Sequence, residues 1–215
     1  MFEKFLLRFQ KAVADARRDI EEVELIAVSK KKPISDIQKV YNSGQYSFGE
    51  NQIQEIEAKW PEFRKDKKNT ILHFVGSIQS RKTHDILDQC DVIHSIDRLK
   101  IVKLVKQYEE TNGIQRKYFL QINTGNESQK SGVLLKEADK FIQDCKETYN
   151  LKIAGLMCLP PQNEEPTKHF NILRGLAMNH NLASLSMGMS HDFEEAIKCG
   201  ATQIRIGTAI FGKRA

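Results

Sequence analysis

The segment Ile26-Ala27-Val28-Ser29-Lys30-Lys31-Lys32-Pro33 passes directly from an apolar run into three lysines and a proline. The apolar run is typical of a buried strand, and proline suits the first turn of a helix. Side chains alternate in direction along a strand, so Ile26, Val28 and Lys30 share one side of it. The segment therefore predicts a strand that leads into a helix and carries one lysine, Lys30, on its inward face.

Short β-rich runs alternate with longer helical patterns from this segment to the end of the chain. Apolar residues recur at intervals of three and four between the runs, for example in Leu99 to Glu110, Leu134 to Thr148 and Asp192 to Cys199. An amphipathic helix, roughly Phe2 to Glu22, precedes the first run. The expected strands are Leu25 to Lys30, Tyr46 to Gly49, Ile71 to Gly76, Val92 to Ile96, Tyr118 to Asn123, Ile153 to Leu159, Ser184 to Gly188 and Gln203 to Gly207.

This alternation predicts the fold class. Strand and helix repeated eight times indicate parallel strands, and eight such units close into a (β/α)8 TIM barrel, here with an extra N-terminal helix. An open doubly wound sheet is the alternative. Pro33 is expected in a first helical turn, Asp97 and Ser190 can cap helices, and Gly200 follows the last periodic residue of its helix.

The composition bounds the domain organisation and the class of ligand. A chain of 215 residues with 40% apolar content is enough for one core, so residues 1–215 are expected to form a single domain. Lys and Arg exceed Asp and Glu by 33 to 28, and the charges are interspersed. This balance suits a small anionic ligand. A nucleic-acid partner is not expected, because no basic stripe interleaved with aromatic residues is present.

Cysteine and histidine spacing gives no signal for a disulfide or a metal site. The four cysteines include no Cys-x-x-Cys pair, and the six histidines include no pair at helical or zinc-finger spacing. The start of the chain lacks the apolar core of a signal peptide, and no segment resembles a membrane span. A soluble, reduced, cytoplasmic protein without a metal is therefore expected.

Lys30 is the first candidate for chemistry. The active site of a (β/α)8 barrel lies at the carboxyl ends of the strands, and Lys30 is the inward residue nearest the end of the first strand. Desolvation lowers the pKa of a lysine in a barrel interior, and a neutral amine forms a Schiff base with an aldehyde. The alternative is a strand-end lysine whose ammonium group extends into water.

Two glycine turns near the end of the chain predict an anion site. Gly188 and Gly207 come at the ends of the seventh and eighth strands, where (β/α)8 barrels frequently bind phosphate through backbone N–H groups. Ser186, Ser190 and Thr208 can add hydroxyl donors. An aldehyde-binding lysine on the first strand and a phosphate site on the last two meet where the barrel closes. Pyridoxal 5′-phosphate (PLP) carries both groups.

Short motifs spread over nearly the whole chain strengthen this hypothesis. They are Ala27-Val28-Ser29-Lys30 with Lys32-Pro33, Phe48-Gly49-Glu50-Asn51 with Gln54-Glu55, His73-Phe74-Val75-Gly76 with Gln79 and Lys82, Ser95-Ile96-Asp97-Arg98, Gln121-Ile122-Asn123, Lys130-Ser131-Gly132, Gly155-Leu156-Met157, Leu185 to Ser190, and Arg205 to Gly212. With them the sequence resembles the pyridoxal phosphate homeostasis protein family, which is similar to the N-terminal barrel of alanine racemase. Two rim positions depart from the family pattern: His191 stands where an acidic residue is common, and Arg81 where Asn is usual.

The resemblance implies a function and a set of site residues. The function is to hold PLP as a Schiff base within the cell and to release it or transfer it. The expected partners are PLP, other B6 vitamers and PLP-dependent apo-enzymes, with no membrane association, and the chain is expected to be a monomer. The implied cofactor contacts are Lys30 at the aldehyde, Arg205 at the pyridine nitrogen, Ser186, Gly207 and Thr208 at the phosphate, and Asn51, His73 and Met187 nearby.

Two of these residues also have structural interpretations. Arg205 shares strand parity with Gln203 and Gly207, so it can point inward toward the ring, but an arginine in a salt bridge at a strand end is the alternative. His73 fits a barrel histidine with satisfied hydrogen bonds as well as it fits a cofactor contact.

Efficient catalysis is not expected of this chain. An arginine keeps its own proton, so it cannot protonate a pyridine nitrogen, and the ring remains a weak electron sink. A two-base racemase also needs a second acid/base group, which alanine racemase takes from a separate domain that this chain has no length to encode. The alternatives are a PLP-dependent racemase or lyase of weak activity, and a phosphosugar enzyme that uses a Schiff-base lysine as barrel aldolases do.

Overall fold

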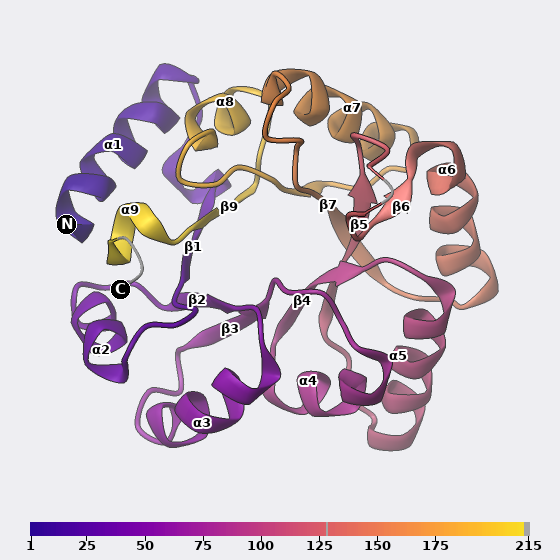
Figure 1. Ribbon diagram of the computed structural model, residues 1–215, viewed down its shortest axis with the longest axis horizontal. Helices are drawn as coiled ribbons and strands as arrows, with labels where there is room; N and C mark the ends of the chain where they lie inside the picture. The colour runs from indigo at the N-terminus through magenta and orange to yellow at the C-terminus, as the bar shows by residue number, and fades with distance from the viewer. Residues whose placement is uncertain (128, 213–215) are drawn as a thin grey trace.

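Eight parallel strands form a closed ring at the centre of the computed structural model, which describes residues 1–127 and 129–212 (Figure 1). The ring consists of β1 (Glu24–Val28), β2 (Ser47–Glu50), β3 (Ile71–Phe74), β4 (Val92–Ile96), β5 (Lys117–Asn123), β7 (Ile153–Cys158), β8 (Ser184–Ser186) and β9 (Gln203–Ile206). Each of these strands pairs with the next one along the chain, and β9 pairs with β1, so the ring has no open edge. The predicted TIM barrel is confirmed, and the alternative of an open sheet is wrong.

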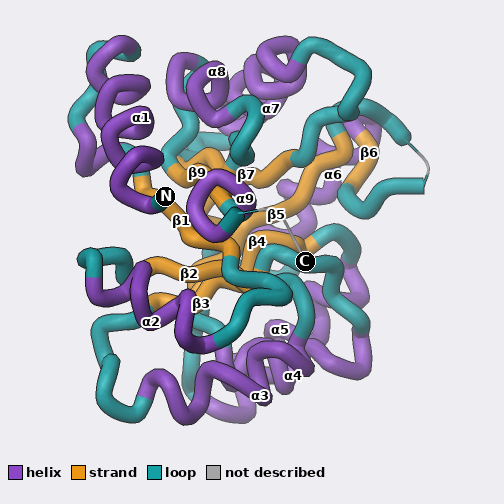
Figure 2. The backbone as a smooth tube through the Cα atoms, turned by 60° about the vertical axis from the view of Figure 1, so that its left-hand side comes forward, coloured by secondary structure: helices purple, strands orange, loops and turns teal. Residues whose placement is uncertain are grey.

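A helix follows each barrel strand and covers the outside of the ring, as Figure 2 shows with helices in purple and strands in orange. The extra N-terminal helix α1 (Phe2–Asp15) packs against the last two helices. Within the described part of the chain, every helix falls short of the length and apolar character that a membrane span requires. The other helices are α2 (Ile34–Asn42), α3 (Ile53–Arg64), α4 (Thr83–Gln89), α5 (Leu99–Asn112), α6 (Leu135–Gln143), α7 (Pro166–Asn179), α8 (Phe193–Lys198) and α9 (Thr208–Phe211).

Two helices end earlier than predicted. The N-terminal helix stops at Asp15, because Arg17 adopts a left-handed conformation with φ of 55° and a separate 3-10 turn follows at Ile20–Glu22. The helical pattern up to Thr148 is divided, since α6 changes into a π-helical turn at Asp144–Thr148. Periodicity therefore identifies both helical regions but not the change of conformation inside them.

Three further details correct the sequence analysis. The residue before α5 is Arg98 rather than Asp97, and the residue before α8 is Asp192 rather than Ser190. A short strand that was not predicted, β6 (Val133–Leu134), pairs with the end of β5. These differences lie in loops and leave the barrel order unchanged.

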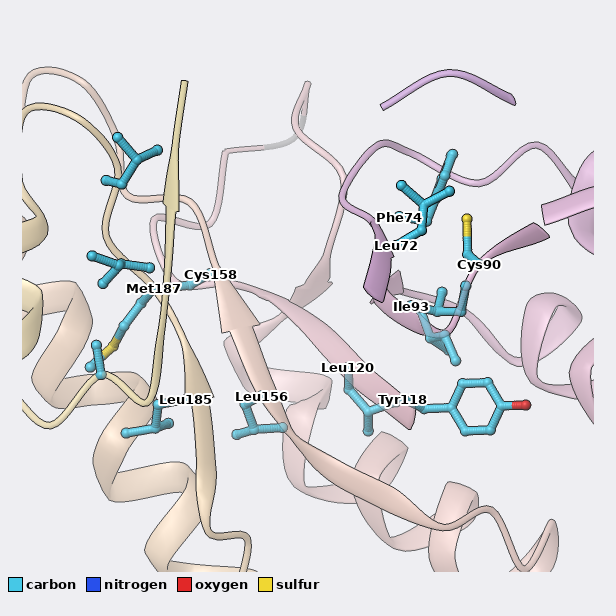
Figure 3. Close-up of a cluster of buried hydrophobic side chains, with 14 of the residues drawn as sticks. Leu72, Phe74, Cys90, Ile93, Tyr118, Leu120, Leu156, Cys158, Leu185 and Met187 are labelled. Carbon is cyan, nitrogen blue, oxygen red and sulfur yellow. The ribbon is translucent and has the colours of Figure 1, made fainter. Parts of the chain in front are cut away.

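The core has two parts, which the strands separate. A large apolar layer lies between strands and helices, and Figure 3 shows part of it. Inside the ring, Val92, Phe119 and Met157 form a small apolar cluster. Buried polar side chains, among them His73 and His94, occupy much of the remaining interior. The centre of the barrel is therefore partly a polar network.

Candidate functional site

Lys30 lies just beyond β1, half-buried, in a pocket of about 290 Å³. Val28 lines the same pocket, so the two residues share the inward side, as the alternation predicts. Lys31, the next residue, is exposed. The other residues that line the pocket are Val75, Leu159, Met189, Ser190, His191, Arg205, Gly207 and Thr208.

A buried ion pair fixes the residue that precedes Lys30. The Glu50 carboxylate, fully buried at the end of β2, accepts hydrogen bonds from the Ser29 hydroxyl at 2.7 Å and from Lys59 Nζ at 2.6 Å. Lys59 also donates to the Ser29 carbonyl oxygen at 3.3 Å. Burial raises the pKa of Glu50, and the ion pair with Lys59 opposes this effect. Ser29 is therefore held through both its side chain and its main chain.

A second carboxylate holds the residue that follows Lys30. Glu55 Oε2 accepts the Lys31 backbone N–H at 2.6 Å and a hydrogen bond from Lys59 Nζ at 2.9 Å. Lys31 has φ of 59°, in the left-handed region that a non-glycine residue adopts only at some cost. The hydrogen bond to Glu55 stabilises this turn, so the backbone is fixed on both sides of Lys30.

Lys59→Met is expected to lower the free energy of unfolding by about 3 kcal/mol, because it leaves the buried Glu50 carboxylate without its cation. The loss is at the low end for a buried pair, since Glu50 with its raised pKa can take up a proton. Urea unfolding followed by circular dichroism measures the change. Lys65→Met is the control, because Lys65 pairs with Glu62 on the surface and should change stability by less than about 1 kcal/mol. Equal losses in the two variants would contradict the role of the buried pair.

Arg205 on β9 lies deeper in the same pocket and is only 5% exposed. Its Nη1 donates to Ser186 Oγ at 2.6 Å, and its Nη2 donates to the Cys158 carbonyl oxygen at 2.9 Å. No carboxylate in the described part of the chain forms an ion pair with it. Burial lowers the pKa of the guanidinium. A guanidinium has several N–H donors, so donors remain for a ligand.

The turn after β8 requires a glycine. Gly188 has φ of 95°, and a Cβ at this position would lie 2.6 Å from Ala196 Cβ in α8. Its carbonyl oxygen accepts the Arg205 backbone N–H at 2.9 Å. The turn brings Ser190 to the pocket, where the hydroxyl oxygen accepts the Ala209 backbone N–H at 3.4 Å. The loops that follow β8 and β9 therefore meet at the pocket.

Half of the predicted contact residues lie together. Lys30, Arg205, Gly207 and Thr208 line the pocket described above. Asn51, directly after β2, is half-buried and lines a separate pocket of about 340 Å³. The structure therefore brings the first and last barrel strands to one site, and Asn51 lies outside its lining.

Three predicted contacts lie away from the pocket surface. Ser186 and His73 are fully buried in the barrel interior, where each contacts His94. Met187 points into the apolar layer outside the ring, near Leu185 (Figure 3). None of the three lines the pocket, so their contact with the cofactor stays a prediction.

Ser190 and Met189 line the pocket although neither is among the implied cofactor contacts. From the sequence Ser190 is expected only as one of three hydroxyl donors. The signal that favours it is its place two residues after Gly188, beyond a turn that only glycine tolerates.

A second pocket of about 340 Å³ adjoins the first and widens the opening of the barrel. It shares Val75, Leu159, Met189 and His191 with the first pocket. On its far side it is lined by Lys130, whose Nζ pairs with Glu127 at 2.6 Å. The site is therefore a broad opening with one deep end at Arg205.

Fold and pocket together define a small-molecule-binding (β/α)8 barrel with a lysine just after its first strand and a buried arginine on its last. Residues 6–215 match the alanine racemase N-terminal domain family. A pyridoxal phosphate homeostasis protein from Pseudomonas aeruginosa is 39% identical over 216 residues, which cover 98% of this chain and 93% of the relative. The chain belongs to the pyridoxal phosphate homeostasis protein family, so the resemblance found in the sequence is confirmed.

Solved structures agree with this assignment. PipY from Synechococcus elongatus, in a structure with PLP bound, is 30% identical to this chain with a TM-score of 0.81, and the match covers 95% of this chain and 100% of PipY. An alanine racemase from Clostridium difficile has a TM-score of 0.75 at 11% identity, and the match covers 95% of this chain and 55% of the racemase. At that identity the likeness to alanine racemase concerns the fold alone.

Proposed function

We propose that this protein binds PLP covalently through Lys30 and takes part in the intracellular homeostasis of PLP. When bound, PLP supplies an aldehyde that reacts reversibly with an amine, together with a phosphate and a pyridine ring. One observation carries the proposal: the buried Arg205, with donors to spare and no carboxylate partner in residues 1–127 and 129–212, lines one pocket with Lys30. A buried cation is costly unless a ligand completes its hydrogen bonds. The names of the relatives and the PLP in PipY support the same ligand.

Each pocket residue has a role that follows from its chemistry. The Lys30 amine attaches the aldehyde, and the remaining Arg205 donors approach the ring nitrogen from the deep end. The hydroxyl groups of Ser190 and Thr208 and the main chain at Gly207 bind the phosphate, where the loops after β8 and β9 meet. The pocket volume of about 290 Å³ is close to the lower end of the roughly 300–1,000 Å³ usual for small-molecule sites.

Arg205 favours storage over catalysis. A guanidinium keeps its proton, so the ring nitrogen receives a hydrogen bond rather than a proton, and the ring withdraws electrons only weakly. Lys30 is half-buried and Thr208 is exposed, so bound PLP can pass to solvent or to another protein. We therefore propose a carrier without efficient turnover, not a racemase or lyase. Exchange of the α-proton of alanine for deuterium can be followed by NMR in heavy water. An exchange rate of about 10 per second would contradict the proposal of a carrier without efficient turnover.

The proposal includes the cellular setting. We propose that the protein interacts with PLP, other B6 vitamers and PLP-dependent apo-enzymes, and that it is located in the cytoplasm. Residues 1–215 act as a single PLP-binding domain and as a monomer. Interspersed charges and a family match over residues 6–215 support a single domain that handles a small anion.

Borohydride reduction followed by peptide mapping tests the covalent attachment. The protein is mixed with PLP, reduced and digested, and mass spectrometry identifies the labelled peptide. The label is expected on the peptide that contains Lys30. A label on Lys130 or another lysine instead, or no label, contradicts the proposal.

Thr208→Ala combined with Ser190→Ala is expected to weaken PLP binding about tenfold, because hydroxyl donors to a charged phosphate are lost. Equilibrium titration with PLP, followed by its visible absorbance, measures the change. Ser184→Ala is the control, because Ser184 begins β8 at the opposite end of the barrel. Unchanged affinity in the double variant would show that the phosphate does not bind at Ser190 and Thr208.

A further inference from the structure

Behind Arg205, buried polar side chains continue through the interior of the barrel toward its opposite end. Ser186 Oγ accepts the hydrogen bond from Arg205 and lies 2.8 Å from His94 Nδ1. His94 Nε2 lies 3.0 Å from His73 Nδ1, and His73 Nε2 lies 3.4 Å from Glu24 Oε1. These side chains come from five different strands, with Arg205 near the carboxyl end of β9 and Glu24 at the start of β1. We call the five residues the interior chain.

The donors and acceptors of the interior chain can be assigned in one direction. Arg205 can only donate, so Ser186 Oγ accepts, and the Ser186 hydroxyl proton remains to be placed. Within the described residues Ser186 Oγ contacts no acceptor other than His94 Nδ1, so the hydroxyl donates there. His94 then carries its proton on Nε2 and donates it to His73 Nδ1. On the other side of the His73 ring, Nε2 lies 3.4 Å from Glu24 Oε1, and in this assignment His94 is neutral.

The surroundings of His94 favour this neutral form. The ring is fully buried and stacks on Phe119, with ring centroids 4.7 Å apart. Burial lowers the pKa of His94 well below its usual value, and the positive charges of Arg205 and Lys117 act in the same direction. A proton on Nδ1 would also remove the acceptor that the Ser186 hydroxyl needs.

The far end of the interior chain carries the opposite charge. Burial alone would raise the pKa of Glu24, but hydrogen bonds from His73, Ser47 and Gln203 outweigh it and lower the pKa to about 2. Glu24 is therefore an anion at neutral pH. The guanidinium of Arg205 and this carboxylate are the charged ends of one row of buried polar contacts, of which the first three are hydrogen bonds and the last is the 3.4 Å contact between His73 Nε2 and Glu24 Oε1.

We propose that Ser186 and His94 are positioning residues, which orient the Arg205 guanidinium so that its remaining donors face the pocket, with Glu24 as the remote counter-charge. The effect on PLP rests on the proposed function. The direction of donors and acceptors along the interior chain does not rest on it. That direction follows from Arg205 being a donor only and from the four contacts that link the residues. In this proposal Ser186 and His73, two of the predicted cofactor contacts, act on the cofactor through Arg205.

Nitrogen NMR of histidine side chains in the protein without PLP tests the alignment. His94 is expected as the neutral tautomer with the proton on Nε2, between about pH 6 and 8. In Ser186→Ala the Nδ1 resonance of His94 is expected to shift, because it loses its donor, whereas Ser184→Ala should leave it unchanged. A charged His94, or a proton on its Nδ1, in the unmodified protein overturns the proposal.

Binding of PLP tests the positioning role. Ser186→Ala and His94→Leu are each expected to weaken PLP binding about tenfold and to shift the pH titration of its visible absorbance. Met157→Leu, inside the ring but outside the interior chain, is the control and should do neither. Unchanged affinity and titration in Ser186→Ala, the milder variant, overturn the positioning role. If the unmodified protein does not bind PLP at all, the proposed function fails instead, and the NMR result still decides the alignment.

Discussion

Replacing Lys30 with alanine is expected to reduce the borohydride-trapped adduct with PLP to background, whereas Lys31→Ala and Lys32→Ala should retain it. Of the three lysines only Lys30 lines the pocket with Arg205. Its backbone is fixed on both sides by the carboxylates of Glu50 and Glu55 through Ser29, Lys59 and Lys31. Mass spectrometry of the intact reduced protein measures the adduct.

The two neighbouring variants make this prediction specific. Each removes one positive charge and the same side chain, so a loss that merely followed the charge of the turn would appear in all three. Equal loss of the adduct would therefore show that strand alternation does not select the attachment site. Urea unfolding of Lys30→Ala is expected within about 1 kcal/mol of the unmodified protein, because Lys30 is only half-buried.

Changing Arg205 is expected to alter both the affinity for PLP and its spectrum. Arg205→Glu should change the pH dependence of the visible absorbance of bound PLP, because a carboxyl group can exchange a proton with the ring nitrogen and a guanidinium cannot. Arg205→Met keeps an apolar stem without donors and should weaken binding about thirtyfold, or ~2 kcal/mol for hydrogen bonds from a charged group. The methionine variant is needed because a buried carboxylate can prevent folding.

Arg116→Met is the control for these variants. Arg116 is half-buried, whereas Arg205 is buried, but like Arg205 it donates to a main-chain carbonyl oxygen, that of Leu87, and it precedes β5 at the opposite end of the barrel. Equilibrium titration and a pH series of absorbance spectra cover all three proteins. An unchanged spectrum in Arg205→Glu, with affinity retained in Arg205→Met, would place the pyridine ring away from Arg205.

Local patterns in the sequence were sufficient to predict the barrel and the inward direction of residues near the strand ends. Each expected strand overlaps an observed one, because a fully buried parallel strand leaves a short apolar run. Lys30 was placed by alternation from Ile26 and Val28, and the same rule placed Arg205 inside the ring. Such predictions need only the direction of neighbouring side chains along one strand.

The remaining contacts depend on residues distant in the sequence. The expected strand runs to Gly188, but β8 ends at Ser186, which is buried behind the pocket, and the turn at Gly188 brings Ser190 to the pocket lining. The pair of Glu50 and Lys59 joins a strand end to the following helix, and no periodicity reveals it. The interior chain likewise needs the ring geometry, since its members lie on five strands.

The pairing of β9 with β1 has a consequence for biosynthesis. Lys30 follows β1, whereas Arg205 lies on β9, so the two sides of the pocket are synthesised at different times. A nascent chain that still lacks β9 has neither Arg205 nor a closed ring, so the pocket forms only after β9 has been synthesised and has paired with β1. A ligand that binds only to the closed ring stabilises it by mass action and thereby lowers the fraction of molecules open to proteolysis.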